Sequence, residues 1–242
     1  MSDLAPDTAG RVFVRSGFRW DAADAYLFDI DGTLLNSRDA VHYLAFHYAV
    51  RKVLGIDASI EGVPVHGNTD VGILRAVLQR AGLSDAVIDE HMPKIVSEMC
   101  GEVKRNREQL RPELCPSILD LITHLQAEGK LLGAASGNLE TVGWLKLERA
   151  GIRAMFAFGS FSFPREIRAD IFQHGIDLAR QRLGGRAAVT VIGDTPADIE
   201  AARIVGTPVI VIATGIFSFD ELRAHEPDAC FACCTDLLAF TG

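Results

Sequence analysis

The stretch AYLFDIDGTLLNS, residues 25–37, decides how this sequence is interpreted. An apolar run ends in two aspartates, Asp29 and Asp31, and Gly32 follows at once. Aspartate is a poor strand residue and is costly to bury without a partner. Parallel sheets bind their ligands at the carboxyl ends of the strands. The pair of aspartates therefore indicates a functional site at the end of a buried strand.

The composition is that of a globular chain, with 242 residues in one large domain or in a core domain with an insert. Hydrophobic residues make up 48% and charged residues 23%, which excludes a disordered chain. The net charge of −8 and the lack of basic clusters argue against nucleic-acid binding. No apolar stretch is long enough to span a membrane, and the N-terminus lacks the features of a signal peptide. Nothing in the sequence indicates the oligomeric state.

The chain has five cysteines, an odd number, and their spacing is irregular. This pattern does not predict a disulfide framework. We therefore expect a cytoplasmic protein. Three of these cysteines lie in the segment CFACC, residues 230–234. No second pair of Cys or His stands nearby to complete a zinc site. We expect small apolar side chains in a short strand and the following turn.

The order of apolar patterns predicts an α/β fold with a helical insert. Residues 39–110 have helical periodicity throughout, whereas strand and helix patterns alternate over residues 111–242. Such alternation predicts a Rossmann-like parallel sheet with helices on both faces. We expect a core of residues 1–38 and 111–242 and a helical cap of residues 39–110. At the N-terminus, we expect a flexible lead followed by a small hairpin over residues 11–20.

Polar residues end three of the predicted buried strands. The segments LFDIDGT, AASGN and VIGDTPAD place at these ends Asp29, Asp31, Ser136, Asp194 and Asp198. In a parallel sheet these ends share one edge. Carboxylates a few ångströms apart repel one another by several kcal/mol at an effective dielectric constant of about 20, so the cluster needs a cation. Oxygen ligands of this kind suit Mg²⁺, which binds one or two carboxylates together with a substrate phosphate.

The segment SGN, residues 136–138, has the features of a phosphate site. The Ser136 hydroxyl precedes Gly137 and Asn138, which we expect to open a helix whose N–H groups face an anion. Glycine also lets the backbone come close to a ligand. A bound phosphate needs a positive side chain as well, and the candidates are Arg165 and Arg168. Arg168 is preferred because it stands just before a helix whose start would face the same sheet edge.

The two aspartates of the opening stretch can have different roles. Asp29 and Asp31 lie two residues apart and point to the same side of an extended strand. One carboxylate can attack phosphorus as a nucleophile and form an aspartyl phosphate. The other can act as general acid for the leaving oxygen and then as general base for water.

In these motifs the sequence resembles the haloacid dehalogenase-like (HAD) hydrolase superfamily. DIDGTL at residues 29–34 resembles the first motif, Ser136 the second, and GDTPAD at residues 193–198 the fourth. Arg168 or Arg165 stands for the basic third motif, although the usual Lys-Pro pair is missing there. The resemblance covers the chain from about residue 25 to its end.

This resemblance implies a role for each motif residue. Asp29 would be the nucleophile, and Asp31 would be the acid/base residue and lend its backbone carbonyl to Mg²⁺. Asp194 would bind Mg²⁺ together with Asp29, and Asp198 would support the metal site from nearby. Ser136, Gly137, Asn138 and the basic residue would hold the phosphoryl group.

The helical insert resembles the C1 cap of the family. Within it, HGNTDVGIL at residues 66–74 resembles a segment of phosphoglycolate phosphatase-like members. This resemblance makes candidate specificity residues of His66, Asn68, Thr69 and Asp70. The alternative is structural, with Thr69 or Asp70 capping the helix that follows.

Together these features predict a Mg²⁺-dependent phosphatase that acts on a small phosphorylated metabolite through an aspartyl phosphate. Asp31 argues against a dehalogenase, because a halide leaving group needs no proton. Phosphoryl transfer of the β-phosphoglucomutase type uses the same intermediate and stays open as an alternative. From a different class, a non-catalytic binding protein with this fold is the other alternative, although such a protein has no use for clustered carboxylates.

Overall fold

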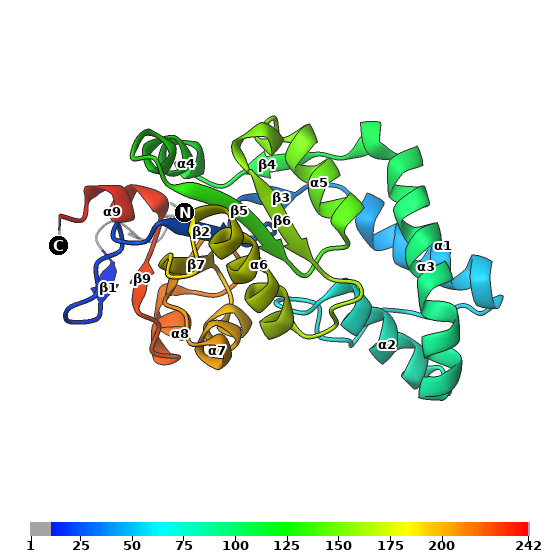
Figure 1. The fold of residues 1–242 in the computed structure, drawn as a ribbon. Helices are drawn as coiled ribbons and strands as arrows, with labels where there is room; N and C mark the ends of the chain where they lie inside the picture. The colour runs from blue at the N-terminus through cyan, green and yellow to red at the C-terminus, as the bar shows by residue number, and fades with distance from the viewer. Residues whose placement is uncertain (1–10, 242) are drawn as a thin grey trace, which may run out of the picture.

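A mostly parallel sheet of seven strands forms the centre of the molecule (Figure 1). In the computed structural model, which describes residues 11–241, the strand order is β1-β9-β8-β7-β2-β5-β6. Neighbouring strands run parallel except β1, which is antiparallel to β9. The strands are β1 Val12–Val14, β2 Ala25–Phe28, β5 Leu131–Ser136, β6 Phe158–Phe161, β7 Val189–Gly193, β8 Val209–Ile212 and β9 Ala229–Phe231.

Helices cover both faces of this sheet, which confirms the predicted fold class. Side chains of α4, α5 and α9 pack on the face of β2 that presents Tyr26 and Phe28. Side chains of α6, α7 and α8 pack on the face that presents Ala25 and Leu27. Because successive side chains of a strand alternate, a strand that is apolar at every position is buried on both sides. These helices are α4 Ile118–Ala127, α5 Glu140–Arg149, α6 Arg168–Leu183, α7 Pro196–Val205, α8 Phe219–Ala224 and α9 Cys234–Ala239.

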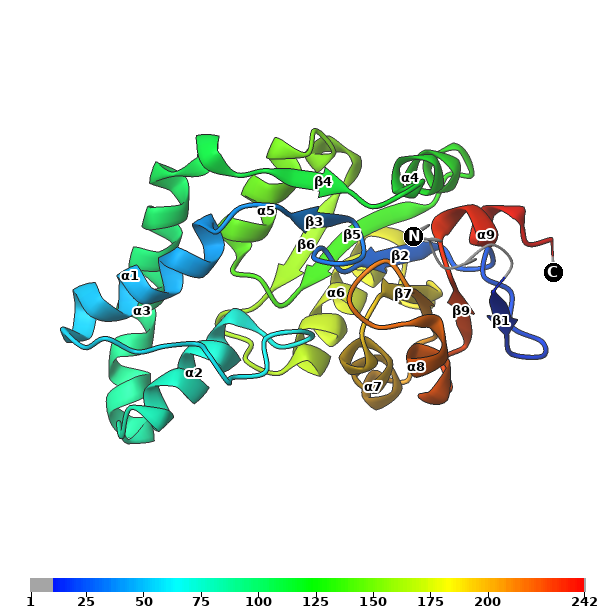
Figure 2. The same ribbon diagram turned by 180° about the vertical axis from the view of Figure 1, so that it is seen from behind.

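Three further helices pack together beside the carboxyl-end edge of the sheet (Figure 2). They are α1 Val41–Leu54, α2 Asp70–Arg80 and α3 Asp85–Arg105, and all lie within the range predicted as a helical insert. Their shared core includes Leu74, Ile88 and Met99 and reaches Leu139 and Val142 at the start of α5. The bundle therefore rests on the same segment that follows the SGN motif.

A small second sheet joins this bundle to the main sheet. Strand β3, Leu35–Ser37, pairs antiparallel with β4, Pro112–Leu114. The chain thus enters and leaves the bundle on two adjacent strands. The sequence does not predict this sheet, because strands of three residues are too short to show a periodic pattern.

The N-terminal segment differs from the prediction. The expected hairpin over residues 11–20 is wrong, because β1 pairs with β9 instead of with a second N-terminal strand. This pairing covers an edge of β9 that would otherwise expose unpaired backbone groups. The flexible lead expected over residues 1–10 lies outside the described residues. No helix in the described part of the chain is long and apolar enough to cross a bilayer.

The CFACC segment is close to its prediction. Cys230 lies in β9 and is buried, as expected for a small apolar side chain in a strand. Cys234 begins α9 instead of lying in a turn. The cysteines among the described residues are free thiols.

The central position of β2 gives a test of the core. Leu27 is fully buried, and its methyl groups occupy the space left open by Gly133 and Gly175, where an added Cβ would come within 3.0 Å and 2.9 Å of them. We expect Leu27→Ala to lower the free energy of unfolding by about 2–5 kcal/mol, because it leaves a cavity in a packed layer. Leu119→Ala on α4, where the side chain is 45% exposed, should change it by less than about 0.5 kcal/mol. Urea unfolding measures both, and equal stabilities would contradict this assignment of the core.

Candidate active site

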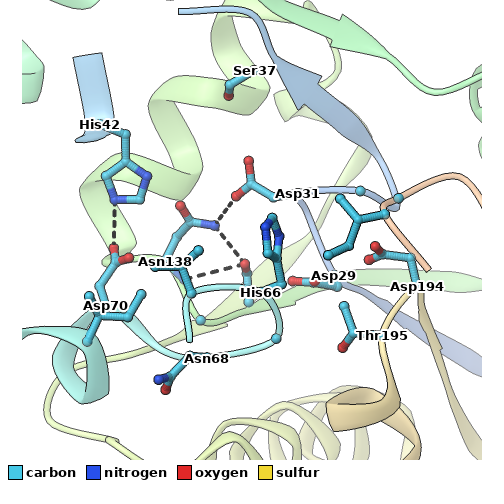
Figure 3. Close-up of a pocket in the computed structure, with 18 of the residues that line it drawn as sticks. Asp29, Asp31, Ser37, His42, His66, Asn68, Asp70, Asn138, Asp194 and Thr195 are labelled. Atoms are coloured by element: carbon cyan, nitrogen blue, oxygen red, sulfur yellow. Dashed lines mark hydrogen bonds and ion pairs between the residues drawn. The ribbon is translucent and has the colours of Figure 1, made fainter. Parts of the chain in front are cut away.

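The polar strand ends meet at one edge of the sheet, as the sequence predicts. Asp29 follows β2, Ser136 ends β5 and Asp194 follows β7, and these three strands are neighbours. Their side chains line a cavity of about 310 Å³ between this edge and the α1–α3 bundle (Figure 3). Arg168 and Asp31 line the same cavity.

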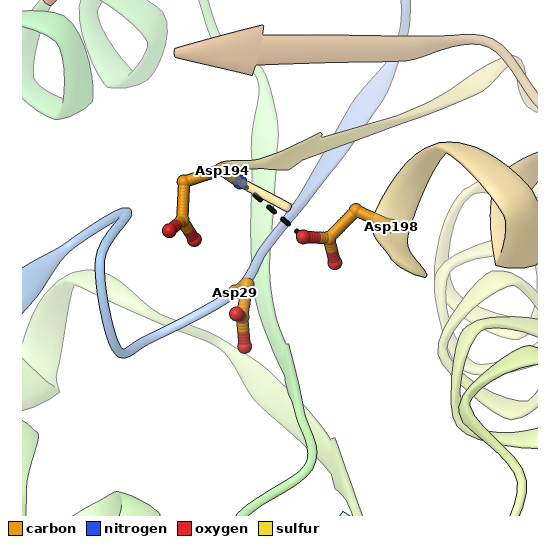
Figure 4. Close-up of side chains that lie close together, drawn as sticks. All are labelled: Asp29, Asp194 and Asp198. Atoms are coloured by element: carbon orange, nitrogen blue, oxygen red, sulfur yellow. Dashed lines mark hydrogen bonds between the residues drawn. The ribbon is translucent and has the colours of Figure 1, made fainter. Parts of the chain in front are cut away.

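Three buried carboxylates lie close together at this edge (Figure 4). Each of Asp29, Asp194 and Asp198 offers an oxygen atom that lies within 4.8 Å of the others. Burial raises the pKa of Asp29 to about 6, against the opposing effect of Arg168. Burial, followed by the charges of Asp198 and Asp29, raises the pKa of Asp194 to about 8. The cluster therefore favours a bound cation, and its hard oxygen donors fit Mg²⁺.

Asp198 has a different environment from the other two carboxylates. Its Oδ2 accepts hydrogen bonds from the Thr195 amide (3.0 Å) and hydroxyl (2.8 Å), and its Oδ1 accepts one from Arg168 Nε (2.8 Å). Thr195 and Asp198 form a capping box at the start of α7, with Pro196 at the first helical position. Because both of its oxygens accept hydrogen bonds, Asp198 is placed to hold the Arg168 side chain and the Asp194 backbone in position.

Arg168 is the cation at the acidic cluster. It is the first residue of α6, and its Nη2 lies 2.7 Å from Asp29 Oδ2 and 2.6 Å from Asp198 Oδ1. Its Nη1 also donates to the Gly67 carbonyl at 3.3 Å. Arg165, the other candidate, is half-buried and does not line the cavity. The structure thus brings the preferred arginine to the site and leaves the alternative outside it.

The SGN segment lines the cavity, but its helix begins later than expected. Asn138 Nδ2 donates to Ser136 Oγ at 2.8 Å and to Asp31 Oδ2 at 2.7 Å. The prediction that Gly137 and Asn138 open a helix is wrong, because α5 begins at Glu140. The amide of Leu139, which precedes the helix, donates to Asp70 Oδ2 at 2.7 Å. The carboxylate of Asp70, from the bundle, therefore accepts the hydrogen bond that we expected an N–H group of this segment to donate to a bound anion.

Lys146 is a site residue that is not predicted from the sequence motifs. It lies on α5 and is 2% exposed, and its Nζ contacts Asp31 Oδ1 at 2.8 Å and Oδ2 at 2.7 Å. Partial burial would raise the pKa of Asp31, but Lys146 and Asn138 outweigh it and lower this pKa. One signal could have revealed the residue, because Lys146 falls on the same helical face as Val142 and Leu147. A lysine on an apolar face is seldom buried without a partner.

Two of the candidate specificity residues hold the bundle against the main sheet. The Thr69 side chain caps α2 by accepting from the Gly72 amide at 3.0 Å, and it donates to the Glu166 carbonyl at 2.6 Å. The Asp70 amide donates to the Gly137 carbonyl at 2.7 Å. The capping alternative thus describes Thr69 well.

The remaining candidates line the cavity on the bundle side. His66 and Asn68 both do so, although Asn68 bonds within its own loop, to the Thr69 amide and the Pro64 carbonyl. His42 of α1 also lines the cavity and was not predicted, and its Nε2 lies 3.0 Å from Asp70 Oδ2 (Figure 3). Its partner, Asp70, is distant in sequence, so no local motif identifies His42 as a site residue.

Comparisons with known proteins agree with this geometry. The family model described as haloacid dehalogenase-like hydrolase matches residues 23–206. A phosphoglycolate phosphatase from Synechococcus elongatus is 28% identical over 217 residues, covering 88% of this chain and 95% of that protein. A probable phosphatase, IndB, from Dickeya dadantii is 28% identical over 220 residues, covering 83% of this chain and 86% of that protein.

Solved structures show the same architecture. A predicted phosphoglycolate phosphatase from Haemophilus somnus has a TM-score of 0.62 at 19% identity, covering 91% of this chain and 98% of that one. The structure of CbbY from Rhodobacter sphaeroides in complex with phosphate has a TM-score of 0.58 at 21% identity, covering 81% of this chain and 87% of that one. Because the family model spans well over half of the sequence and the fold agrees with it, this protein belongs to the haloacid dehalogenase-like hydrolases.

Proposed function

We propose that this hydrolase is a Mg²⁺-dependent phosphatase that acts on a small phosphorylated metabolite through an aspartyl phosphate on Asp29. The observation that carries the proposal is the position of Asp29, a buried carboxylate that lines the cavity and is paired with a single arginine. The relatives named as phosphatases support the same reaction. We still expect the protein to act in the cytoplasm.

The residues around Asp29 suit attack on phosphorus. Arg168 can shift part of its contact from Asp29 to the oxygens of an incoming phosphoryl group, and Ser136 offers a hydroxyl at the neighbouring strand end. When bound, Mg²⁺ would be held by Asp29, Asp194 and the Asp31 carbonyl, and it would neutralise the phosphoryl charge. Asp29 would then form the covalent bond to phosphorus.

Asp31 is placed to handle the proton. Its side chain is 42% exposed and lines the cavity, so it can reach the oxygen of the leaving alcohol. It would donate a proton to that oxygen, and it would then accept one from the water that hydrolyses the aspartyl phosphate. The same carboxyl group thus serves both halves of the reaction.

We take residues 39–110 as a cap that excludes water from this chemistry. Its contacts with the core surround the site, with Gly67 bonded to Arg168 and Asp70 bonded to Gly137 and Leu139. Farther out, Arg75 Nε donates to both oxygens of Glu166, at 2.7 Å and 2.8 Å. The leaving group would occupy the cap side of the cavity, beside His42, His66 and Asn68, which are proposed to set substrate preference.

Turnover of p-nitrophenyl phosphate tests the reaction. We expect the wild-type protein to release phosphate with Mg²⁺ and to stop in EDTA, and we expect Asp29→Asn to be inactive because it lacks the nucleophile. Asp31→Asn should lose at least about 10²-fold, the low end for general acid–base catalysis. No phosphate release by the wild type, or wild-type turnover by Asp29→Asn, would contradict the proposal. Transfer of phosphate to a sugar phosphate without release would favour the mutase alternative.

A matched pair of arginine variants tests the phosphate-holding role. Arg168→Ala should lower kcat/KM by about 10²–10³-fold, because it removes a preorganised charge from the reacting group. Arg165→Ala, which removes an arginine outside the cavity, should stay close to wild type. A larger loss for Arg165→Ala than for Arg168→Ala would reverse the assignment.

Thermal unfolding without substrate tests the metal site. The folded chain holds Asp194 with a pKa near 8, above its unfolded value, so the protonated folded form is favoured at low pH. The metal-free protein should therefore lose stability as the pH rises from about 4 to about 8, and Mg²⁺ should restore it.

Asp194→Asn removes the charge and should flatten this pH dependence. It should also raise the melting temperature in EDTA near pH 8 and greatly weaken the response to Mg²⁺. Asp120→Asn, on the exposed side of α4, is the control and should behave as wild type. A full Mg²⁺ response in Asp194→Asn would show that the metal binds elsewhere.

A further inference from the structure

Lys146 is a buried cation whose polar contacts go to the proposed acid/base residue, Asp31, and to Asn138, which also contacts Asp31. The ammonium group has three N–H donors. Two of its contacts go to the oxygens of Asp31, at 2.8 Å and 2.7 Å, and the third goes to Asn138 Oδ1 at 2.9 Å. The donors of Lys146 are thus fully used, and they fix the position of the group.

Asn138 extends this arrangement to the phosphate side of the site. Because its Oδ1 accepts from Lys146, its Nδ2 is turned toward Asp31 Oδ2 and Ser136 Oγ (Figure 3). The Asp31 carboxylate is therefore held from two directions, by an ammonium from α5 and by an amide from the end of β5. A carboxylate held in this way has one defined orientation toward the cavity.

The fold alone does not account for this lysine. The side chain of Asp31 is 42% exposed to the cavity, so its charge is tolerated without a buried partner, whereas the side chain of Lys146 is only 3% exposed. Burying an ammonium costs several kcal/mol before its contacts offset that cost. An apolar residue would fit the same helical face as Val142 and Leu147 at no such cost.

We propose that Lys146 is a positioning residue that holds the Asp31 carboxyl group beside the leaving oxygen of the substrate. It acts on the proton-transfer step alone, whereas Arg168, which contacts Asp29, acts on the phosphoryl group. When Asp31 gives up its proton to the leaving alcohol, the resulting carboxylate lies next to the ammonium group. This inference rests on the proposed phosphatase function and assigns to Lys146 a role within it.

A series of leaving groups tests this role. The probes are p-nitrophenyl, phenyl and benzyl phosphate, whose leaving groups become more basic at nearly constant size and so depend more on proton donation. We compare kcat/KM, which covers the steps through release of the alcohol. Lys146→Met should lose about 10²-fold on benzyl phosphate, the scale of a misplaced catalytic group, and less than about threefold on p-nitrophenyl phosphate.

Further comparisons separate a positioning role from other roles. Asp31→Asn should show the same rising loss along the series, and adding Lys146→Met to it should cost little more, because one residue acts through the other. Lys146→Arg, which keeps the charge, should recover part of the benzyl phosphate activity. Lys104→Met, an exposed lysine of α3, should match wild type. Inhibition by inorganic phosphate should be unchanged in Lys146→Met.

Other outcomes would overturn the proposal. Equal losses on all three probes, together with weaker inhibition by phosphate, would place Lys146 among the groups that hold the phosphoryl group. No loss on any probe would remove a role in the reaction. If Lys146→Met unfolds, as melting curves would show, Lys146→Arg alone must still give a loss that rises along the series. Inactivity of the wild type on every probe would instead contradict the proposed function.

Discussion

The site depends on the neutralisation of buried negative charge at one edge of the sheet. Asp29, Asp194 and Asp198 are all buried there, and isolated charges in such a place are prohibitively costly. Arg168 offsets part of this charge by contacting Asp29 and Asp198 together. In the proposed function a divalent cation would neutralise the remainder, and this cation and Arg168 would together accept the negative charge of a phosphoryl group. The buried carboxylates therefore leave negative charge at this edge that Arg168 offsets only in part.

Close backbone contacts link the α1–α3 bundle to the edge of the main sheet. The backbone of the loop before α2 comes so close to the SGN segment that a Cβ on Gly137 would collide with Asn68 and Thr69. On its other side, Gly67 has a positive φ of 74° and bonds to Arg168. A side chain at either glycine would move the loop away from the site. The position of the loop before α2 and the orientation of Arg168 are thus linked through backbone contacts.

The sequence predicts most of the residues at the strand ends that form the site, but it does not predict the helix residues that contact them. Asp29, Ser136 and Asp194 could be placed because each lies at or directly after the end of a buried strand, β2, β5 or β7, and parallel strands bring their ends together. Lys146 and His42 could not be placed in the same way, since each lies on a helix and meets its carboxylate partner only in the folded chain. Their local patterns record helical faces and carry no information about that partner.

Errors at element ends have a similar physical origin. The sequence SGN predicts a helix start at Asn138, two residues before the observed start of α5, whereas the backbone of Gly137 and Leu139 bonds to Asp70 instead. The alternation of residues 11–20 predicts a local hairpin, whereas the partner of β1 is β9, which lies more than 200 residues away in sequence. Tertiary contacts decided both cases, and no local propensity describes them.

The central claim is that Asp29 carries the phosphoryl group during turnover, and acid-quenched turnover with phosphate-labelled p-nitrophenyl phosphate and Mg²⁺ tests it most directly. The account predicts label on the peptide that contains Asp29 during turnover, its disappearance as substrate is exhausted, and no labelled protein for Asp29→Asn. Steady release of labelled phosphate, with no label on the protein at any quench time, would contradict it.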